Sequence, residues 1–426
     1  MARFDSLLDW LNWQEGFHPR SIDLGLDRAA SVFKALNPEA IKPPTIIVAG
    51  TNGKGSSIAF LEAIYRAQGY RVGTYTSPHI LQYNERIKID GEAVADEIIC
   101  QAFERIDTVR NDVSLSYFEF GTLAALDIFW RSALDVQLLE VGLGGRLDAV
   151  NIIDSDVSLI TSICIDHVDW LGETREAIAY EKSGIFRENV PAVIGDINPP
   201  ESLSQQATKT HTPLFSINEE FNFQHTAQSW DWSCSGDKQR RYVSLPPPAL
   251  KGEHQFRNAA SVLMAVTEMQ ALLPVNEHSI RQGLQAIQLK GRFQLIEGDI
   301  PVLLDVAHNP QAVTSLLQYL QSDFSDKKIH AVFAMMKDKD ITGVIEIIKP
   351  VIKDWFIAPL TNSRTASESV MQACFSQSGL NDVNFGFKDF SETYAAAENN
   401  AESGDLILVF GSFFLVSEYL ANAENT

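Results

Sequence analysis

The residues with the clearest chemical signal form the glycine-rich segment 48–57, VAGTNGKGSS. Its glycines allow backbone N–H groups to turn toward phosphate oxygens, and Lys54 can reach the terminal phosphates of a nucleotide. The common pattern GxxxxGK[ST] is not met, because the two outer glycines stand closer together and a further glycine follows the lysine. A strand-to-helix turn that is rich in glycine for steric reasons is the alternative. The candidate phosphate-binding residues are Gly50, Thr51, Asn52, Gly53, Lys54, Gly55 and Ser56.

A second candidate is the carboxylate of Glu140 in the segment 136–151, VQLLEVGLGGRLDAVN. A buried parallel strand is usually apolar along its whole length, so a glutamate within it is unexpected. Burial of that carboxylate is costly unless it is paired or bound to a cation, and a buried salt bridge is as good an explanation as a metal. The run GLGGRL superficially resembles a dinucleotide-binding fingerprint, but Leu147 takes the place of the last glycine.

A third candidate is the strand end at 157–172, VSLITSICIDHVDWLG, where Asp166 and His167 follow the strand. Ligands of open parallel sheets bind beyond the carboxyl ends of the strands, so Lys54, Glu140 and His167 are expected to converge there. Oxygen and imidazole ligands around a nucleotide indicate Mg²⁺ or Mn²⁺. A capping or surface role is the alternative for the histidine.

Other polar positions have little signal by themselves. Lys182 reads as a solvated helix lysine, and the segment SPHI (77–80) reads as a loop before a helix. Asp305 and His308 lie at another strand end. Arg292 lies in a connection between domains, where it could contact a phosphate or be an exposed linker residue.

The elements that must position these residues follow the pattern of an α/β fold. Short β-branched runs alternate with segments of helical periodicity, which indicates mostly parallel sheets covered by helices. Strands are predicted at 45–50, 136–142, 157–163, 302–307, 329–336, 355–359 and 405–411. Helices are predicted at 57–68, 120–133, 258–273 and 310–321.

Two changes of pattern suggest the domain organisation. The segment at about 198–250 reads as a β-rich excursion that ends in a proline run, and the β/α alternation restarts after 289–301. We therefore expect a large N-terminal domain at 1–293 and a smaller C-terminal domain at 294–426.

Composition excludes several classes of protein. The chain has 426 residues, 45% of them hydrophobic, which is typical of a globular protein. A net charge of −21 argues against a nucleic-acid binder. Four scattered cysteines indicate neither a disulfide scaffold nor a zinc ribbon, so a cytoplasmic location is expected. The N-terminus does not read as a secretion signal, and the apolar run 406–416 is about half of the roughly 20 residues that a membrane helix needs.

Nine motifs, taken in order, resemble the folylpolyglutamate synthase/dihydrofolate synthase family of the Mur ligase superfamily. They are TNGKGS, SPH, FEFGT, EVGLGGRLDAVN, DHVDWLG, EKSGIFR, RNAASVL, GRFQ and DVAHNP, and the resemblance runs from Asp23 to about Ser412. It implies an N-terminal P-loop domain of the Mur ligase type and a Rossmann-like C-terminal domain, with catalysis between them. It also implies that ATP activates a carboxylate as an acyl phosphate, which the amino group of L-glutamate then attacks.

The resemblance implies specific roles for the candidate residues. The segment 50–56 would bind the ATP phosphates, and further nucleotide contacts would come from Asn258, Arg292 and Asp305. Lys54, Lys182 and, more loosely, His308 would be catalytic, while Ser412 would lie near the glutamate. Two Mg²⁺ ions, with K⁺ as a possible addition, would be held by Ser77, Glu140, His167 and a carboxylated Lys182.

Three further segments resemble the dihydropteroate pocket of the bifunctional bacterial members: IDLGLDR (22–28), SYFE (116–119) and LDA (147–149). Ser116 replaces the threonine of the family, which keeps the hydroxyl and loses a methyl contact. The implied pocket residues are Asp23, Leu24, Ser116, Tyr117, Phe118, Glu119, Leu147, Asp148 and Ala149.

The expected function is therefore a bifunctional ligase acting on 7,8-dihydropteroate, tetrahydrofolates and L-glutamate. The expected protein is a monomer without nucleic-acid or membrane partners. An enzyme that only extends the glutamate tail is the alternative. A peptidoglycan-precursor ligase of the same superfamily would lack SYFEFGT and DLGLDR. A non-enzymatic nucleotide-binding protein would leave the metal and lysine motifs without a purpose.

Overall fold

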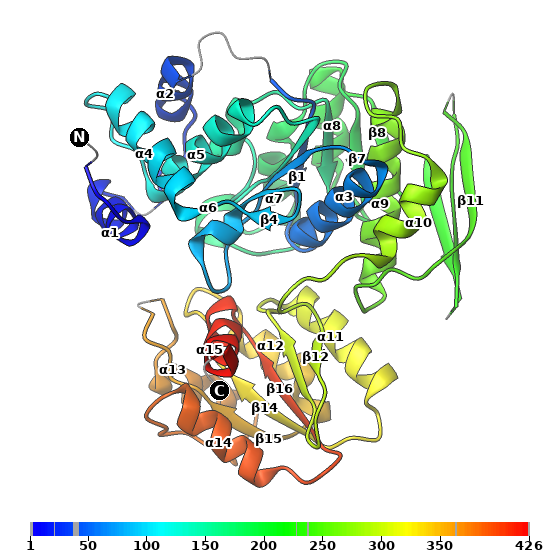
Figure 1. Cartoon of the computed structure of the whole chain (residues 1–426). Helices are drawn as coiled ribbons and strands as arrows, with labels where there is room; N and C mark the ends of the chain where they lie inside the picture. Colours follow the sequence, from blue (N-terminus) through cyan, green and yellow to red (C-terminus); the bar gives the residue numbers. More distant parts are fainter. Residues whose placement is uncertain are drawn as a thin grey trace. The chain divides into compact units, whose positions relative to one another are not determined.

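The computed structural model describes residues 3–20, 22–36, 42–226, 228–236, 238–362 and 364–424. Contacts divide the chain into two compact units, which Figure 1 shows in sequence colours. The first unit comprises 1–249 and 256–287, and the second comprises 250–255 and 288–426. Among the described residues, no helix is both long and apolar enough to span a membrane.

The first unit is built on a sheet that has eight strands within the described segments, in the order β4-β3-β2-β5-β1-β6-β7-β8. Strands β2, β5, β1, β6, β7 and β8 run parallel to one another, while β3 pairs antiparallel with β2 and β4 pairs antiparallel with β3 at one edge. The strands are β1 (Thr45–Ala49), β2 (Val72–Tyr75), β3 (Ile87–Ile89), β4 (Glu92–Ala93), β5 (Val136–Glu140), β6 (Val157–Ile160), β7 (Ala192–Ile194) and β8 (Leu214–Ser216). This confirms the prediction of a mostly parallel central sheet.

Helices pack on this sheet because its central strands are apolar on both faces, and β1, β5 and β6 are buried along their whole length. The helices of the unit are α1 (Leu7–Phe17), α2 (Asp27–Leu36), α3 (Lys54–Gln68), α4 (Asp96–Val109), α5 (Tyr117–Arg131), α6 (Val168–Leu171), α7 (Arg175–Lys182), α8 (Glu201–Thr210), α9 (His254–Glu268) and α10 (Glu277–Gln285). Short 3₁₀ turns are η1 (Tyr83–Arg86), η2 (Ala149–Ile152), η3 (Ser183–Ile185) and η4 (Met269–Ala271).

Alternate strand residues divide between two layers. Ile47, Leu139 and Ile160 belong to the core that also contains side chains of α1, α2, α4, α5 and α7. Their neighbours along the strands point to the other face, because side chains alternate in a strand. Helix α3 packs on β1, β2 and β5 and also on α10, and Figure 1 shows α9 and α10 on the same side of the molecule as α3.

The segment 198–250 contains helix α8 and strand β8 before a separate antiparallel sheet of β9 (Phe221–His225), β10 (Trp230–Cys234) and β11 (Arg240–Leu245). Trp230 and Trp232 of β10 are buried, and the indole N–H of Trp232 donates to the backbone oxygen of Ala260 in α9. The two tryptophans of this segment are therefore core residues.

The second unit has a smaller sheet, five strands in the described part, in the order β12-β13-β16-β14-β15, with only β12 antiparallel to its neighbour. Its strands are β12 (Gln294–Ile296), β13 (Val302–Asp305), β14 (Ile329–Phe333), β15 (Ile352–Ile357) and β16 (Leu406–Phe410). Its helices are α11 (Pro310–Asp323), α12 (Ile341–Ile348), η5 (Lys349–Val351), α13 (Glu368–Gln377), α14 (Phe390–Asn400) and α15 (Phe413–Glu424).

Every predicted strand and helix is present, and the differences lie at the ends. The helix predicted at 57–68 begins earlier, at Lys54, because Gly53 caps it with a left-handed backbone. The strand predicted at 329–336 ends at Phe333, and Met336 instead makes an isolated bridge to Thr365. The sequence predicts a change of domain at 293–294, whereas the contacts divide the chain at 287–288 and add 250–255 to the second unit.

Candidate active site

The glycine-rich loop joins β1 to α3 and lies against the residues that follow β6. The backbone N–H of Thr51 donates to Ser162 O at 2.7 Å, and that of Asn52 donates to Ser162 Oγ at 3.2 Å. A Cβ atom on Gly50, whose φ is 151°, would lie 1.9 Å from Thr161 Oγ1. Only glycine fits there, so the neighbouring strand end determines the shape of the loop.

Gly53 makes the turn into the helix and brings Asn258 to the loop. Its φ of 90° is left-handed, and a Cβ atom there would lie 2.7 Å from Asn258 Oδ1. Asn258 is buried in α9. Because α3 has 15 residues, its N-terminal end presents a positive dipole to the loop, which favours an anionic ligand.

Two lysines meet at one carbonyl oxygen of this loop. Lys54 Nζ donates to Gly50 O at 3.0 Å and to Thr51 O at 3.1 Å, and Lys182 Nζ, from the end of α7, donates to the same Gly50 O at 2.9 Å. Lys182 is buried. The prediction from its sequence segment alone, a solvated helix lysine, is therefore wrong. Burial, together with the positive charge of Lys54, lowers the pKa of the Lys182 amine to about 7.

Glu140 is the last residue of β5 and lies at the same strand ends. Its side chain is buried, and its Oε2 accepts a hydrogen bond from the backbone N–H of Ser77 at 3.1 Å. A Cβ atom on Gly55 would lie 3.9 Å from this oxygen. The structure thus brings Ser77, Glu140 and the start of α3 together.

His167 immediately precedes α6 as its N-cap and has a left-handed backbone, φ 52°. Its backbone N–H donates to Asp166 Oδ1 at 2.8 Å, and its ring Nε2 lies 4.0 Å from Asp166 Oδ2. The charge of Asp166 also acts on the Lys182 amine, so this turn lies in the same electrostatic environment as the two lysines. A non-glycine residue in this conformation carries strain, a feature that is concentrated at functional sites.

These residues suit a divalent cation that is shared with phosphates. In the described segments no three His, Cys, Asp or Glu side chains gather closely enough to form a metal cage. Mg²⁺ usually needs only one or two protein carboxylates, and phosphate oxygens and waters complete its shell. A single buried carboxylate, Glu140, beside a phosphate-type loop fits that requirement.

The three predicted dihydropteroate segments also come together. Ser116 and Glu119 form a capping box at the start of α5: Ser116 N donates to Glu119 Oε2 at 2.7 Å, and Glu119 N donates to Ser116 Oγ at 3.3 Å. The Phe118 ring packs on Gly142, where a Cβ atom would be 2.5 Å from the ring. The backbone N–H of Gly25 donates to Leu147 O at 3.2 Å, which ties the loop of Asp23 and Leu24 to the LDA segment.

Asp148 and its neighbours form the third segment of this region. The Asp148 carboxylate accepts backbone N–H groups from Leu143 at 2.8 Å and from Val150 at 3.0 Å, and Ala149 is buried in the turn that it caps. Burial raises the pKa of Asp148 to about 6, against the opposing effect of these hydrogen bonds and of Lys54. Tyr117 is the first residue of α5, and its ring packs at 5.7 Å from that of Tyr83.

The second unit holds its own cluster of predicted residues at the carboxyl ends of β13 and β16. Asp305 accepts backbone N–H groups from Phe293 at 3.1 Å and Ala307 at 2.8 Å, and burial raises its pKa to about 6. The Arg292 guanidinium lies over the Phe413 ring at 5.0 Å, and the His308 ring is 6.1 Å from the same ring. His308 Nδ1 lies 2.8 Å from Val306 O.

Two helices start in this cluster. Ser412 Oγ accepts the backbone N–H of Leu415 at 3.1 Å at the start of α15, and Asn309 Oδ1 accepts that of Ala312 at 3.0 Å at the start of α11. The side chain of Asn309 is thus a helix cap. Open parallel sheets bind their ligands at such strand ends, next to helix N-termini.

Sequence reasoning missed three contributors to these clusters. Thr161 and Ser162 support the glycine-rich loop, and their position at a strand end could have identified them. Phe413 carries the cation–π contact with Arg292, and nothing in its sequence context marks it as a partner of an arginine 121 positions away.

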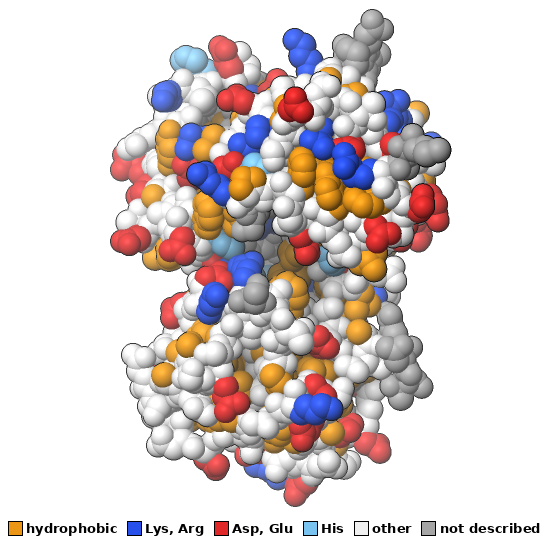
Figure 2. All heavy atoms as spheres, turned by 90° about the vertical axis from the view of Figure 1, so that its left-hand side faces the viewer, with side chains coloured by type: hydrophobic (Ala, Val, Ile, Leu, Met, Phe, Trp, Pro, Cys, Tyr) orange, Lys and Arg blue, Asp and Glu red, His pale blue; other side chains and the backbone are white. Residues whose placement is uncertain are grey.

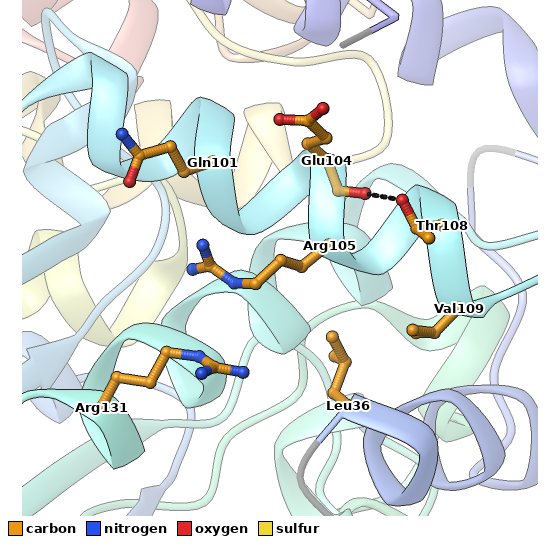
Figure 3. Close-up of a pocket in the computed structure, with 7 residues that line it drawn as sticks. All are labelled: Leu36, Gln101, Glu104, Arg105, Thr108, Val109 and Arg131. Atoms are coloured by element: carbon orange, nitrogen blue, oxygen red, sulfur yellow. Dashed lines mark hydrogen bonds between the residues drawn. The ribbon is translucent and has the colours of Figure 1, made fainter. Parts of the chain in front are cut away.

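A separate pocket, of about 430 Å³, contains none of the predicted site residues (Figure 3). It is lined by Leu36, Gln101, Glu104, Arg105, Thr108, Val109 and Arg131. The fully buried carboxylate of Asp127 accepts 2.8 Å hydrogen bonds from the Nε atoms of both Arg105 and Arg131. These arginines are therefore accounted for by a structural ion pair.

Comparison with known proteins places this geometry in a family. Residues 48–266 match the model of the Mur ligase middle domain, and residues 291–413 match that of the Mur ligase glutamate ligase domain. The chain is 41% identical to the dihydrofolate synthase/folylpolyglutamate synthase of Haemophilus influenzae, over 98% of each chain.

Solved structures agree over nearly the whole chain. A structure of E. coli FolC in complex with DHPP and ADP has a TM-score of 0.92 and 38% identity, covering 99% of each chain. A bifunctional folylpolyglutamate synthase/dihydrofolate synthase with Mn, AMPPNP and L-glutamate bound has a TM-score of 0.90 and 39% identity, covering 99% of this chain and 98% of that one. On these matches, the chain belongs to the Mur ligase family, among the dihydrofolate synthase/folylpolyglutamate synthases.

Proposed function

We propose that this chain is an ATP-dependent ligase that joins the amino group of L-glutamate to the carboxylate of 7,8-dihydropteroate or of a tetrahydrofolate. One observation carries the proposal: Lys54, Lys182 and Glu140 lie around the glycine-rich loop, and Asp148, which the charge of Lys54 affects, is part of the three-segment dihydropteroate region. The names and bound molecules of the relatives support the same reaction.

The chemistry has two steps. A carboxylate oxygen of the acceptor attacks the γ-phosphorus of ATP, the bond to the β-phosphate oxygen breaks, and ADP leaves. The glutamate nitrogen then attacks the acyl carbon, inorganic phosphate leaves with the bonding electrons, and the nitrogen loses a proton to give the amide. Negative charge on the transferring phosphoryl group is the main barrier, so positioned cations contribute most of the catalysis.

The residues of this chain supply that environment. Lys54 and the loop 50–56 hold the phosphates, and Asn258, Arg292 and Asp305 contact the nucleotide. Ser77, Glu140 and His167 are the groups that would hold a divalent cation, which would neutralise phosphate charge when bound. We assign His308 to catalysis and Ser412 to the glutamate side, because both lie at the strand ends of the second unit.

Lys182 is assigned as a carboxylated lysine. Its neutral amine nitrogen attacks the carbon of CO₂, the nitrogen loses a proton, and a carbamate anion results. The buried position and the pKa of about 7 support this assignment, because an ordinary lysine is almost fully protonated at neutral pH. The carbamate would turn a cation into an oxygen ligand for a second Mg²⁺, and K⁺ is a further candidate ion.

Two further assignments, of the cellular compartment and of the oligomeric state, complete the proposal. The four cysteines, all in described segments, are free, which supports a reducing cytoplasmic compartment. We assign a monomeric state, which sedimentation of the purified protein tests directly.

The deciding experiment measures ADP release by the purified protein with ATP, Mg²⁺ and L-glutamate. Dihydropteroate should stimulate ADP release and be converted to dihydrofolate. Turnover with tetrahydrofolate but none with dihydropteroate would restrict the enzyme to tail extension. Absence of glutamate-dependent ADP release with either acceptor would contradict the ligase assignment.

A further inference from the structure

A polar network connects two of the predicted dihydropteroate segments and includes His18 and Arg28, to which the sequence assigned no role. It links the loop that precedes α2, the start of α2 and the capping box of α5. Its charged members are His18, Asp23, Arg28 and Glu119. Arg28 lies at the centre of the network.

Arg28 uses all three of its guanidinium nitrogens within this network. Its Nη1 lies 3.0 Å from Asp23 Oδ2, and its Nη2 donates to Asp23 O at 2.7 Å. On the other side, its Nε donates to Glu119 Oε1 at 3.2 Å, and Nη2 lies 3.1 Å from the same oxygen. A planar guanidinium makes such forked contacts, whereas an ammonium group is a point charge.

The carboxylates of Glu119 and Asp23 differ in their exposure and in their other contacts. The Glu119 side chain is 4% exposed and already accepts the backbone N–H of Ser116, so its position is nearly fixed. The Asp23 side chain is 20% exposed; its Oδ2 also lies 3.0 Å from His18 Nε2, and its Oδ1 is contacted at 3.4 Å by Arg20, whose side chain is 73% exposed. Asp23 Oδ1 can therefore accept a hydrogen bond from a ligand while Oδ2 stays anchored.

His18 connects Asp23 to the residues just before α5. Its ring Nδ1 lies 2.8 Å from Ser114 Oγ, just before the capping box, and its side chain is 7% exposed. The hydrogen bond from His18, followed by the charge of Arg28, lowers the pKa of Asp23, so this carboxylate stays ionised. The loop of Asp23 is thus attached to α5 through two independent connections.

Resting on the proposed function, we infer that Arg28 is a positioning residue for the dihydropteroate pocket, which holds Asp23 and Glu119 in the arrangement that binds this substrate. Without the guanidinium, the two negative carboxylates would lose the cation between them, and the more exposed one, Asp23, would move away. Displacement of a binding group by about 1 Å is enough to weaken a site by one or two orders of magnitude.

The test compares Arg28→Gln, Arg28→Lys and Arg20→Gln by steady-state kinetics. Arg28→Gln should raise the KM for dihydropteroate about tenfold or more, with the KM for ATP unchanged within about twofold. Arg28→Lys keeps the positive charge but loses the forked hydrogen bonds of the guanidinium. It should raise the KM for dihydropteroate by a smaller factor. Arg20→Gln removes an exposed guanidinium from the same Asp23 and should match the parent protein.

The outcomes separate this inference from the proposed function. An unchanged KM for dihydropteroate in both Arg28 variants would overturn the inference, and so would an equal rise in the KM for ATP. If Arg28→Gln fails to fold, Arg28→Lys decides on the same criterion. Absence of dihydropteroate-dependent ADP release in the parent protein would instead contradict the function on which the inference rests.

Discussion

At the scale of single residues, the decisive feature is the meeting of Lys54 and Lys182 at Gly50 O. Burial penalises the charge of Lys182, and the nearby ammonium group of Lys54 repels it, so Lys182 gives up its proton easily. Burial and the charge of Lys54 thus lower the pKa of Lys182, the lysine that reaches this carbonyl oxygen from the end of α7. The buried carboxylate of Glu140 lies at the start of α3, where its Oε2 would be 3.9 Å from a Cβ atom on Gly55.

Replacing Lys182 by alanine should lower kcat by about two orders of magnitude, because a charged group at the phosphate site is lost. Added formate or acetate should restore part of the turnover by taking the place of the carbamate. The matched control is Lys209→Ala, which removes an exposed lysine of α8. Full activity in the Lys182→Ala variant would show that no carbamate is needed.

Carboxylation of Lys182 should depend on pH in a defined direction. The carbamate forms only from the neutral amine, and the pKa of about 7 means that the neutral fraction grows as pH rises through 7. At a fixed partial pressure of ¹³CO₂, the carbamate signal in ¹³C NMR should therefore rise between about pH 6 and pH 8. Lys182→Ala should lack that signal, and a signal that is flat over this range would contradict the assignment.

Replacing Glu140 by glutamine should raise the Mg²⁺ concentration for half-maximal activity by about tenfold or more. The amide keeps the shape and an oxygen that can accept the Ser77 N–H, but it lacks the negative charge. Activity as a function of Mg²⁺ measures the effect, and circular dichroism checks the fold. A destabilised variant with an unchanged Mg²⁺ requirement would favour a structural role.

At the scale of elements, the run GLGGRL has a packing function. A Cβ atom on Gly145 would lie 2.9 Å from Lys182 O, and one on Gly184 would lie 2.3 Å from Arg146 Cα. The backbone N–H of Arg146 donates to Glu181 O at 2.7 Å. These glycines therefore let the loop after β5 approach the end of α7 and hold Lys182 at the glycine-rich loop.

Replacing Gly184 by alanine should lower the free energy of unfolding by about 1–3 kcal/mol, because the added methyl group would overlap Arg146. Thermal or urea unfolding measures the change. Gly16→Ala in α1 is the matched control, since a Cβ atom there meets nothing within 4 Å and alanine favours a helix. A Gly184→Ala variant as stable as the control would show that the close approach can relax.

At the scale of the whole molecule, the net charge of −21 describes the surface more than the site. Figure 2 shows acidic and basic side chains interspersed over the visible face. The cations assigned to the phosphates are few and local, chiefly Lys54 and Arg292, and part of the acidic excess, such as Glu140 and Asp305, belongs to the two clusters. The net charge therefore argued against nucleic-acid binding but gave no information on ATP binding.

The sequence by itself determined the α/β class, the predicted strands and helices, the glycine-rich loop and the family. Strand and helix periodicity, capping residues and loop glycines are local properties, and they read correctly without knowledge of the fold. The start of α3 at Lys54 was missed because the left-handed backbone of Gly53, which caps the helix beside Asn258, is visible only in the structure.

Only the tertiary structure decided the environment of Lys182, the network of Arg28 and the contact of Arg292 with Phe413. Lys182 lies 132 positions from Gly50, and Arg28 lies 91 positions from Glu119. Residues so far apart carry no mutual pattern in the sequence, and the pKa of a lysine depends on the burial and charges that the fold creates around it. The sequence motifs therefore identified the candidate reacting side chains, whereas tertiary packing determined their positions and their protonation.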